Sequence, residues 1–514
     1  MTRLVHCSVA AALLLLSGGS WAEGCDDPLS AAPRLTAAAL DLDALRGFYR
    51  EPAACVWTDA SAALLQAVLA RLGEEGLDPE QFHAAALAER ATPTDSAVAA
   101  ERDLLASDAA LAYARAMVEG RVDPAAVRDQ IWFPRPNFDP AELLRMALDN
   151  GELAAWLAGL PPSDPQYAAL KAALVQYRGL TEWLSVQPPE AKTIEPGQRT
   201  TIVPALAQRL AAEGDLAAGD AEATASDGRA LDGPVLAALK HFQQRHGLTP
   251  DGRLGKQSFV SLNVSLADRI GQIVANLERR REVAHLLPPT RIEVNVASAT
   301  LTVLRDGEPV SSMRAVVGDP EHQTPMLISS IRDVEVNPPW IVPASIIQKE
   351  IRPKLRRDPT YLERNDMTWT GGQLIQAPGA KNSLGHLKFE FPNPFSVYLH
   401  DTPMHRLFAL DARELSHGCV RLEHPLDLAQ LLLAASKPDS IQQAIDKGQT
   451  THIRLPESMP VAVLYWSAYV EADGTVDFRD DLYQRDARLV AALKAPHRTA
   501  AGTAEHCTGT CRNT

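Results

Sequence analysis

The hydrophobic pattern of this chain changes once, near residue 291, and that change limits the possible folds more than any other feature. Upstream, Ala and Leu recur at helical spacing in segments 60–72, 97–120 and 140–157. Downstream, apolar and polar residues alternate, and Asp306-Gly307 supplies a hairpin turn. A block of helices followed by a block of strands predicts a multidomain α+β protein.

The helical block is expected to form a scaffold domain over residues 23–195, with its proline-rich breaks in loops. At 514 residues the chain exceeds the size at which one hydrophobic core stops growing, so two to four domains are expected. The composition, 46% hydrophobic and 22% charged, is that of an ordinary globular protein.

A second helical unit is expected over residues 196–265. Its amphipathic helical segments are followed by a Gly247-Leu248 turn and an Asp251-Gly252 loop. These phrases resemble the small three-helix peptidoglycan-binding module, and a helical spacer without a ligand is the alternative. Within the unit, segment 215–229 is polar and rich in Ala and Gly, which predicts an inserted loop. Residues 266–288 are expected to form a linker helix.

The β-rich region is expected to form a mainly antiparallel β-sandwich over residues 289–455. Its later strands are expected at 334–336, 389–391 and 397–399. Segment 340–371 is not strand-like and has a helical pattern, so we expect a helical insertion that caps the functional groove. Residues 456–495 are expected to pack back on the scaffold, and residues 496–514 to form a disordered tail.

The first 22 residues have the parts of a secretory signal peptide. Arg3 lies in a short n-region, an apolar stretch follows, and Ser20-Trp21-Ala22 is a small-x-small cleavage site. The mature chain is therefore expected to begin near Glu23. No later segment has the roughly 20 apolar residues of a membrane span, so none is expected after cleavage. Cys25 would suit a lipoprotein, but Glu23 is a poor fit to the small and apolar residues expected before a lipidated cysteine.

Six cysteines become five once Cys7 leaves with the signal peptide. In an oxidising compartment, an odd number leaves at least one thiol unpaired. Cys25 and Cys55 flank an N-terminal segment and are candidates for a disulfide, while Cys507 and Cys511 lie together in the tail. Cys419 is the expected unpaired cysteine.

The net charge of −14 argues against a nucleic-acid partner, because binding phosphates needs clustered Lys and Arg. Two basic runs, Arg279-Arg280-Arg281 and residues 349–357, depart from the acidic average. Both are predicted to be solvated helix faces. For the second, guidance of an anionic substrate is the alternative.

The candidate chemistry lies in Tyr398-Leu399-His400 and Ser416-His417-Gly418-Cys419. A thiol is nucleophilic as the thiolate, so Cys419 needs a base or a positive partner. His400 is expected to lie on the same strand face as Tyr398 and to meet the thiol, with Asp401 fixing its tautomer through the main chain or the side chain. Gly418 permits a tight turn whose N–H groups, with that of Cys419, could face an oxyanion.

These residues resemble the signature of the L,D-transpeptidases. The signature has a histidine, a spacer of 14 to 17 residues and then Ser/Thr-His-Gly-Cys, and here residues 401–415 separate His400 from Ser416. Arg421 follows two places after the cysteine. Further phrases resemble the large Gram-negative branch, which has a helical scaffold and a capping subdomain. They are Asn337-Pro338-Pro339-Trp340, Val342-Pro343, Ser345, Asn382-Ser383-Leu384-Gly385 and Lys388-Phe389.

The resemblance implies a role for each matching position. Cys419 would be the nucleophile and His400 the proton acceptor and later donor. The residues that would shape the oxyanion region are Tyr398, Ser416, His417 and Gly418. The residues that would bind substrate are Arg421, Trp340 and Asn382.

The resemblance also implies a periplasmic enzyme that joins peptidoglycan stems. Attack on a tetrapeptide stem would release D-alanine and leave a thioacyl enzyme. A diaminopimelate amine of a second stem would then resolve it and give a 3-3 cross-link. The implied partners are stem peptides, glycan and other cell wall synthases, with no metal and no organic cofactor.

The residues alone leave other functions and other roles for single residues open. The same Cys and His suit an L,D-carboxypeptidase or another envelope amide hydrolase, and a non-catalytic peptidoglycan-binding scaffold is a further reading. Ser416 and His417 are also suited to bracing the turn, and Arg421 to a structural ion pair. A zinc site of His400, His405 and His417 is disfavoured, because their spacing matches no recognisable ligand pattern.

Overall fold

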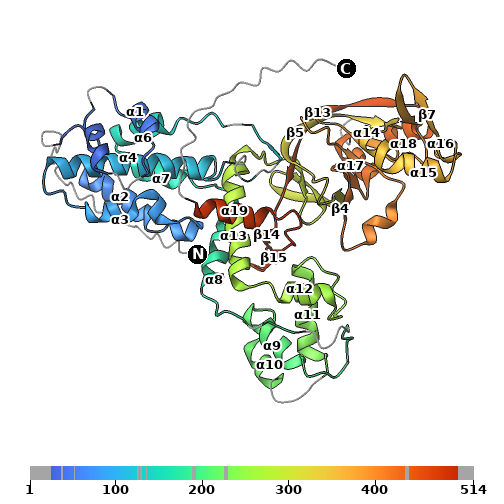
Figure 1. Ribbon diagram of the computed structural model, residues 1–514, viewed down its shortest axis with the longest axis horizontal. Helices are drawn as coiled ribbons and strands as arrows, with labels where there is room; N and C mark the ends of the chain where they lie inside the picture. The colour runs from blue at the N-terminus through green and yellow to red at the C-terminus, as the bar shows by residue number, and fades with distance from the viewer. Residues whose placement is uncertain are drawn as a thin grey trace, which may run out of the picture.

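The computed structural model describes residues 25–35, 39–50, 53–123, 127, 130–134, 136–183, 185–187, 193–224, 230–433 and 439–495. The predicted signal peptide and tail, with Cys7, Cys507 and Cys511, lie outside the described residues. The molecule is elongated, with helices at one end, the β-rich domain at the other and a small helical module projecting between them (Figure 1).

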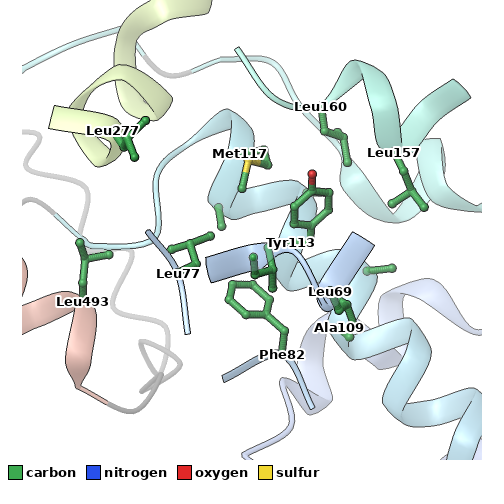
Figure 2. Close-up of a cluster of buried hydrophobic side chains, with 14 of the residues drawn as sticks. Leu69, Leu77, Phe82, Ala109, Tyr113, Met117, Leu157, Leu160, Leu277 and Leu493 are labelled. Carbon is green, nitrogen blue, oxygen red and sulfur yellow. The ribbon is translucent and has the colours of Figure 1, made fainter. Parts of the chain in front are cut away.

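The scaffold is built around α4 (Ser96–Val118), which begins where the Asp95 carboxylate accepts the N–H groups of Ala97 and Val98. Its neighbours are α1 (Leu42–Phe48), α2 (Asp59–Leu69), α3 (Ala84–Glu89), α6 (Pro140–Asp149), α7 (Leu153–Gly159), α8 (Pro165–Arg178) and the 3₁₀ turns Pro28–Arg34, Leu72–Glu75 and Pro79–Phe82. Figure 2 shows Tyr113 and Met117 of α4 among apolar side chains from other scaffold elements. A disulfide between Cys25 and Cys55 joins two N-terminal segments, as the cysteine positions suggested.

The same core extends into helices from the C-terminal half of the chain. Leu277 of α13 (Leu266–Val283) and Leu493 of α19 (Arg485–Lys494) border it in Figure 2. Strands β14 (Ala468–Val470) and β15 (Val476–Phe478) also contribute buried residues to this core. The C-terminal segment thus shares a hydrophobic core with the scaffold helices.

The prediction that Arg279-Arg280-Arg281 forms a solvated face is wrong. All three are buried on α13, and Arg281 has no exposed surface. Arg279 pairs with Asp486 at 2.6 Å, Arg280 with Asp164, and Arg281 with Glu278 at 2.7 Å. These arginines are buried because α13 is covered by α8 on one side and by α19 and β14 on others.

The module has its own hydrophobic core. Its described helices are α9 (Val203–Ala212), α10 (Ala218–Thr224), α11 (Gly233–Arg245) and α12 (Lys256–Leu262). Helix α10 lies inside segment 215–229, so the prediction of an inserted loop is wrong for that part. It forms there because Leu216 and Ala221 are buried in the module core.

The β-rich domain contains one sheet that closes on itself, in place of the predicted antiparallel sandwich. Its strands are β2 (Arg291–Asn295), β3 (Thr300–Arg305), β4 (Glu308–Gly318), β5 (Met326–Val336), β9 (Leu387–Phe389), β10 (Leu399–His400), β12 (Val420–Leu422) and β13 (Thr451–Leu464), with β1 (Ile131–Trp132) on β5 and β11 (Glu414–Ser416) on β4. The order β5-β13-β2-β3-β4-β12-β10-β9 returns to β5 through the β5–β9 pairing. Pairs β2–β13 and β10–β12 are parallel.

Closure of the sheet changes two predicted boundaries. Strand β13 pairs with β2 and β5 as far as Leu464, so the sheet continues past residue 455. Strand β1, which lies between the scaffold helices α4 and α6 in the chain, pairs with β5 and joins the same sheet. Local periodicity could not reveal either feature, because both depend on pairing between distant segments. Helices α17 (Pro425–Leu433) and α18 (Asp439–Asp446) and the 3₁₀ turns Ala284–Leu286 and His405–Ala409 complete the domain.

The capping insertion contains strands as well as helices, which corrects the prediction that segment 340–371 is a helical insertion without strands. Its strands β6 (Trp340–Ile341), β7 (Met367–Thr370) and β8 (Gln373–Gln376) form a separate sheet in the order β6-β8-β7. Its helical elements are α14 (Ala344–Ile346), the π-helical turn Ile347–Ile351, α15 (Arg352–Arg357) and α16 (Tyr361–Arg364). The cap therefore extends beyond residue 371, and it has its own small apolar cluster.

The buried arginines of α13 give a stability prediction. Arg281 donates to Glu278, to the Tyr167 hydroxyl and to the Glu75 carbonyl. Arg281→Ala removes the guanidinium that donates two hydrogen bonds to the buried Glu278 carboxylate, so we expect a loss of about 3–5 kcal/mol in the free energy of unfolding. Urea unfolding monitored by circular dichroism measures it, with exposed Arg352→Ala as the control. If Arg281→Ala lowers the free energy of unfolding no more than the control does, Arg281 does not stabilise the fold through its buried ion pair.

Candidate active site

Two short strands place the candidate catalytic side chains. Strands β10 and β12 run parallel, with His400 opposite Arg421, and the Val420 N–H donates to the Tyr398 carbonyl at 3.1 Å. Because residues two apart share a strand face, Tyr398 and His400 lie on the same face as Cys419 and Arg421. The register thus brings four of the predicted site residues together, although β10 begins at Leu399 and not at residue 397.

His400 is a buried, neutral base. It is 5% exposed, and its Nδ1 donates to the main-chain carbonyl of Asp401 at 2.5 Å. Of the two partners predicted at Asp401, the structure thus shows the main chain, and this tautomer leaves Nε2 free to accept a proton. Burial first, then the positive charges of Arg421 and Lys388, lower the pKa of His400 to about 3. The imidazole is therefore uncharged at neutral pH.

Cys419 is the free cysteine among the described residues. Its half-buried thiol lies by the Tyr398 hydroxyl and 4.0 Å from the Ser396 carbonyl. Burial raises the pKa of the Cys419 thiol and outweighs the opposing effects of Tyr398 and Arg421. No hydrogen bond joins this thiol to His400, which is its diagonal neighbour across the two strands. We predicted that the imidazole and the thiol meet. In the structure they lie on the same strand face, but they are not hydrogen-bonded to each other.

A row of charged residues crosses the sheet at His400. In register, Glu335 of β5 lies opposite Lys388 of β9, Lys388 opposite His400, and His400 opposite Arg421. The Lys388 ammonium lies 3.3 Å from the Glu335 carboxylate and 4.7 Å from the Tyr398 ring centroid. Sequence reasoning did not select Lys388 as a site residue. The available signal was its position between Leu387 and Phe389, whose buried side chains indicate that Lys388 faces outward.

The turn before Cys419 is braced by Ser416. Its hydroxyl donates to the Cys419 carbonyl at 2.5 Å and accepts the Gly418 N–H at 3.1 Å, while Gly418 has a φ of 105°. The predicted use of the Gly418 N–H toward an oxyanion is therefore wrong, because Ser416 already engages it. Among the described residues, no acceptor takes the Cys419 N–H. Thr324, which sequence reasoning missed, donates from its hydroxyl to the Gly418 carbonyl at 2.9 Å.

His417 faces the cap. Its Nε2 lies 3.0 Å from the carboxylate of Glu350 in the π-helical turn, and its ring lies 4.6 Å from that of His322. Arg421 is half-buried, and its Nε has no hydrogen-bond partner. Burial lowers the pKa of Arg421 and outweighs the opposing effects of nearby Glu350 and Cys419.

Trp340 and Asn382 both have packing or hydrogen-bonding partners within the protein, and the substrate contact predicted for Trp340 stays a prediction. Trp340 is half-buried against the apolar cluster of the cap. Asn382 is 1% exposed, and its Nδ2 donates to the carbonyls of Pro338 and Ala377. Its Oδ1 accepts the Leu384 N–H, so the amide is used within the protein. Trp340 and Asn382 thus lie where the chain enters and leaves the cap.

Comparison with known families assigns this domain. Residues 289–453 match the family model of the L,D-transpeptidase catalytic domain, and residues 43–174 match that of a scaffold domain. The chain carries an L,D-transpeptidase catalytic domain. The L,D-transpeptidase match covers β2 to β12, the first residues of β13, the cap, His400 and Cys419, and leaves out β1 and most of β13. The helical module between the two matched regions lies outside both.

One named relative agrees with this assignment of the L,D-transpeptidase domain. A Haemophilus influenzae protein named "Putative L,D-transpeptidase" is 27% identical over 267 residues, which cover 47% of this chain and 54% of the relative. The chain thus matches about half the length of that relative.

Solved structures with lower similarity include other L,D-transpeptidases. One from Mycobacterium smegmatis is 18% identical, covering 34% of this chain and 58% of its own, with a TM-score of 0.19. Another from Xylanimonas cellulosilytica is also 18% identical, covering 54% of this chain and all of its own, with a TM-score of 0.17. At these TM-scores, the two structures decide neither the fold nor the activity.

Two further observations concern the described residues alone. Within them, no group of three or more His, Cys, Asp or Glu side chains is arranged to hold a metal ion. No helix in the described ranges is long and apolar enough to cross a membrane.

The pKa shifts of the site predict how the free thiol reacts with pH. The pKa of Cys419 is raised and that of His400 lies near 3, so no imidazolium stabilises the thiolate between pH 5 and 8. We expect alkylation of Cys419 by iodoacetamide to accelerate about tenfold per unit from pH 6 to pH 8, as the thiolate fraction grows. Mass spectrometry of the peptide containing Cys419 measures the rate. A rate that levels off below pH 8 would contradict a protonated resting thiol.

Proposed function

We propose that this chain is a periplasmic L,D-transpeptidase that forms 3-3 cross-links through a thioacyl enzyme on Cys419. The observation that carries the proposal is the β10–β12 register, which puts a free thiol and a neutral imidazole on one face of the matched domain. The donor is a tetrapeptide stem, attacked at the carbonyl between diaminopimelate and the terminal D-alanine. The acceptor is the diaminopimelate side-chain amine of a second stem.

The acylation step uses the groups around Cys419. As Nε2 of His400 takes the thiol proton, Sγ bonds to the donor carbonyl carbon, and in this proposal the N–H of Cys419 stabilises the oxyanion. The C–N bond to D-alanine then breaks, and His400 returns the proton to the departing amine. Because His400 and Cys419 are diagonal neighbours, a side-chain rotation on donor binding has to close the gap between them.

The second half of the reaction reverses the first. The acceptor amine attacks the thioester carbon and forms the new amide, and its proton passes through His400 to Sγ as the C–S bond breaks. Arg421, Lys388 and the Tyr398 hydroxyl contribute positive potential and a hydrogen bond to the anionic sulfur. Every group in this cycle is a side chain or N–H of the chain itself, so the proposed reaction needs neither a metal nor an organic cofactor.

The proposed setting follows from the N-terminal sequence and the substrate. A cleaved signal peptide at residues 1–22 would deliver the protein to the periplasm, where stem peptides and glycan are accessible. The module at 196–265 is proposed to contact glycan, and other cell wall synthases are proposed to supply donor strands.

Product analysis tests the reaction. Purified tetrapeptide muropeptides are incubated with the protein and separated for mass spectrometry. Dimers linked through two diaminopimelates are expected. Tripeptide monomers alone would instead show an L,D-carboxypeptidase, and the absence of both products would favour a non-catalytic scaffold.

The nucleophile is tested by substitution. A carbapenem, as an acylating β-lactam, is expected to add covalently to the protein at Cys419. Cys419→Ala is expected to abolish the adduct and both products, since Cys419 is the free cysteine among the described residues, while binding to sacculi stays within about twofold. Intact-mass spectrometry and sacculus sedimentation measure the two properties. An adduct that persists in the variant would contradict the assignment.

The base is tested in the same assay. His400→Gln keeps a polar side chain of similar size but removes the proton acceptor, so cross-linking is expected to fall by about 10²–10⁴-fold. Exposed His452→Gln serves as the control and is expected to leave the rate unchanged. A His400→Gln enzyme within threefold of the unmodified enzyme would show that His400 is not the base.

A further inference from the structure

Arg421 carries a positive charge with unused binding capacity beside the thiol. It lies two residues beyond Cys419 on the same strand face, about 6–7 Å along the strand. Its Nε is buried without a hydrogen-bond partner, and among the described residues no carboxylate forms an ion pair with it. A donor stem ends in a carboxylate only a few bonds from the carbonyl that Sγ attacks. Arg421 therefore faces the region that the terminal carboxylate of a bound donor must enter.

A carboxylate of the protein already lies next to this position. Glu350 projects from the π-helical turn of the cap and contacts His417 at 3.0 Å, and its electrostatic attraction to Arg421 partly offsets the lowering of the Arg421 pKa by burial. Single π-turns within helices occur frequently at functional sites. The two side chains of the Glu350–His417 pair are 36% and 38% exposed, so water screens their attraction and the pair is easily displaced.

Glu350 has a second charged partner within the cap, in addition to His417. Lys354 of α15 lies one helical turn away, with its ammonium 3.4 Å from the Glu350 carboxylate. If Glu350 leaves His417, its charge remains paired with Lys354. The carboxylate can therefore leave the active site without becoming unpaired, which makes its contact with the catalytic motif reversible.

We propose that Glu350 is a specificity-determining residue whose carboxylate competes with the terminal carboxylate of the donor stem for Arg421 and His417. This inference rests on the proposed transpeptidase function, because it takes a D-alanine-terminated stem as the donor. In the resting state, Glu350 keeps an anion beside Arg421. A donor carboxylate enters by displacing it toward Lys354, so weakly bound anions are excluded.

The test measures peptide binding in a form that cannot turn over. In a Cys419→Ala background, isothermal titration calorimetry compares a tetrapeptide stem ending in D-alanine with the same stem ending in D-alaninamide. Glu350→Gln keeps a hydrogen-bonding group toward His417 but removes the charge. The matched control is Glu363→Gln, which removes the same charge from an exposed position of the cap on α16.

Glu350→Gln is expected to tighten binding of the carboxylate peptide about three- to tenfold, and to leave binding of the amide peptide within twofold. Glu363→Gln is expected to change neither. The proposal is overturned by unchanged or weaker binding of the carboxylate peptide, by an equal gain for both peptides, or by no binding of either. Cross-linking by the unmodified enzyme is scored separately. An active enzyme with no Glu350 effect refutes this inference alone, whereas an enzyme without products or adducts refutes the proposed function.

Discussion

The buried arginines of α13 are the interactions on which the arrangement of the domains depends. Adjacent helical residues point about 100° apart, so Arg279, Arg280 and Arg281 reach different partners around one helix. Arg279 pairs with Asp486 of α19, Arg280 with Asp164 before α8, and Arg281 with Glu278 and Tyr167. Because a buried charge is tolerated only when it is paired, α13 can pack in one orientation. The scaffold and the C-terminal segment are thereby fixed around the helix that leads into the catalytic sheet.

The electrostatics of the catalytic face follow from strand pairing within that sheet. The β9–β10 and β10–β12 pairings place His400 between Lys388 and Arg421, and the β5–β9 pairing adds Glu335 beside Lys388, so the buried imidazole lies between two cations. Both effects oppose its protonation, which keeps His400 available as a base. Burial also keeps the thiol protonated. The resting site therefore holds an uncharged acid and an uncharged base, and thiolate formation is left to donor binding.

Prediction from the sequence succeeded where the signal was local. Helical spacing located α4 and α9, alternation located β2 and β3, and the cysteine positions suggested the Cys25–Cys55 bond. It failed for features that depend on distant pairing. The closed sheet, the extension of β13, the β-strands of the cap and the burial of Arg281 all arise from contacts between segments far apart in the chain.

The candidate site also has some features that are local in sequence and others that depend on distant contacts. The sequence by itself determined the spacing between His400 and Cys419 and the glycine turn at Gly418, directly before the cysteine. Both are local properties, because the order of residues along the chain and the conformational freedom of glycine set them. Only the tertiary structure decided that Thr324 binds the Gly418 carbonyl, that Lys388 joins the site and that Glu350 of the cap meets His417. The physical reason is that pKa values, hydrogen-bond occupancy and ion pairing depend on which surfaces pack together, and residues distant in sequence supply those surfaces here.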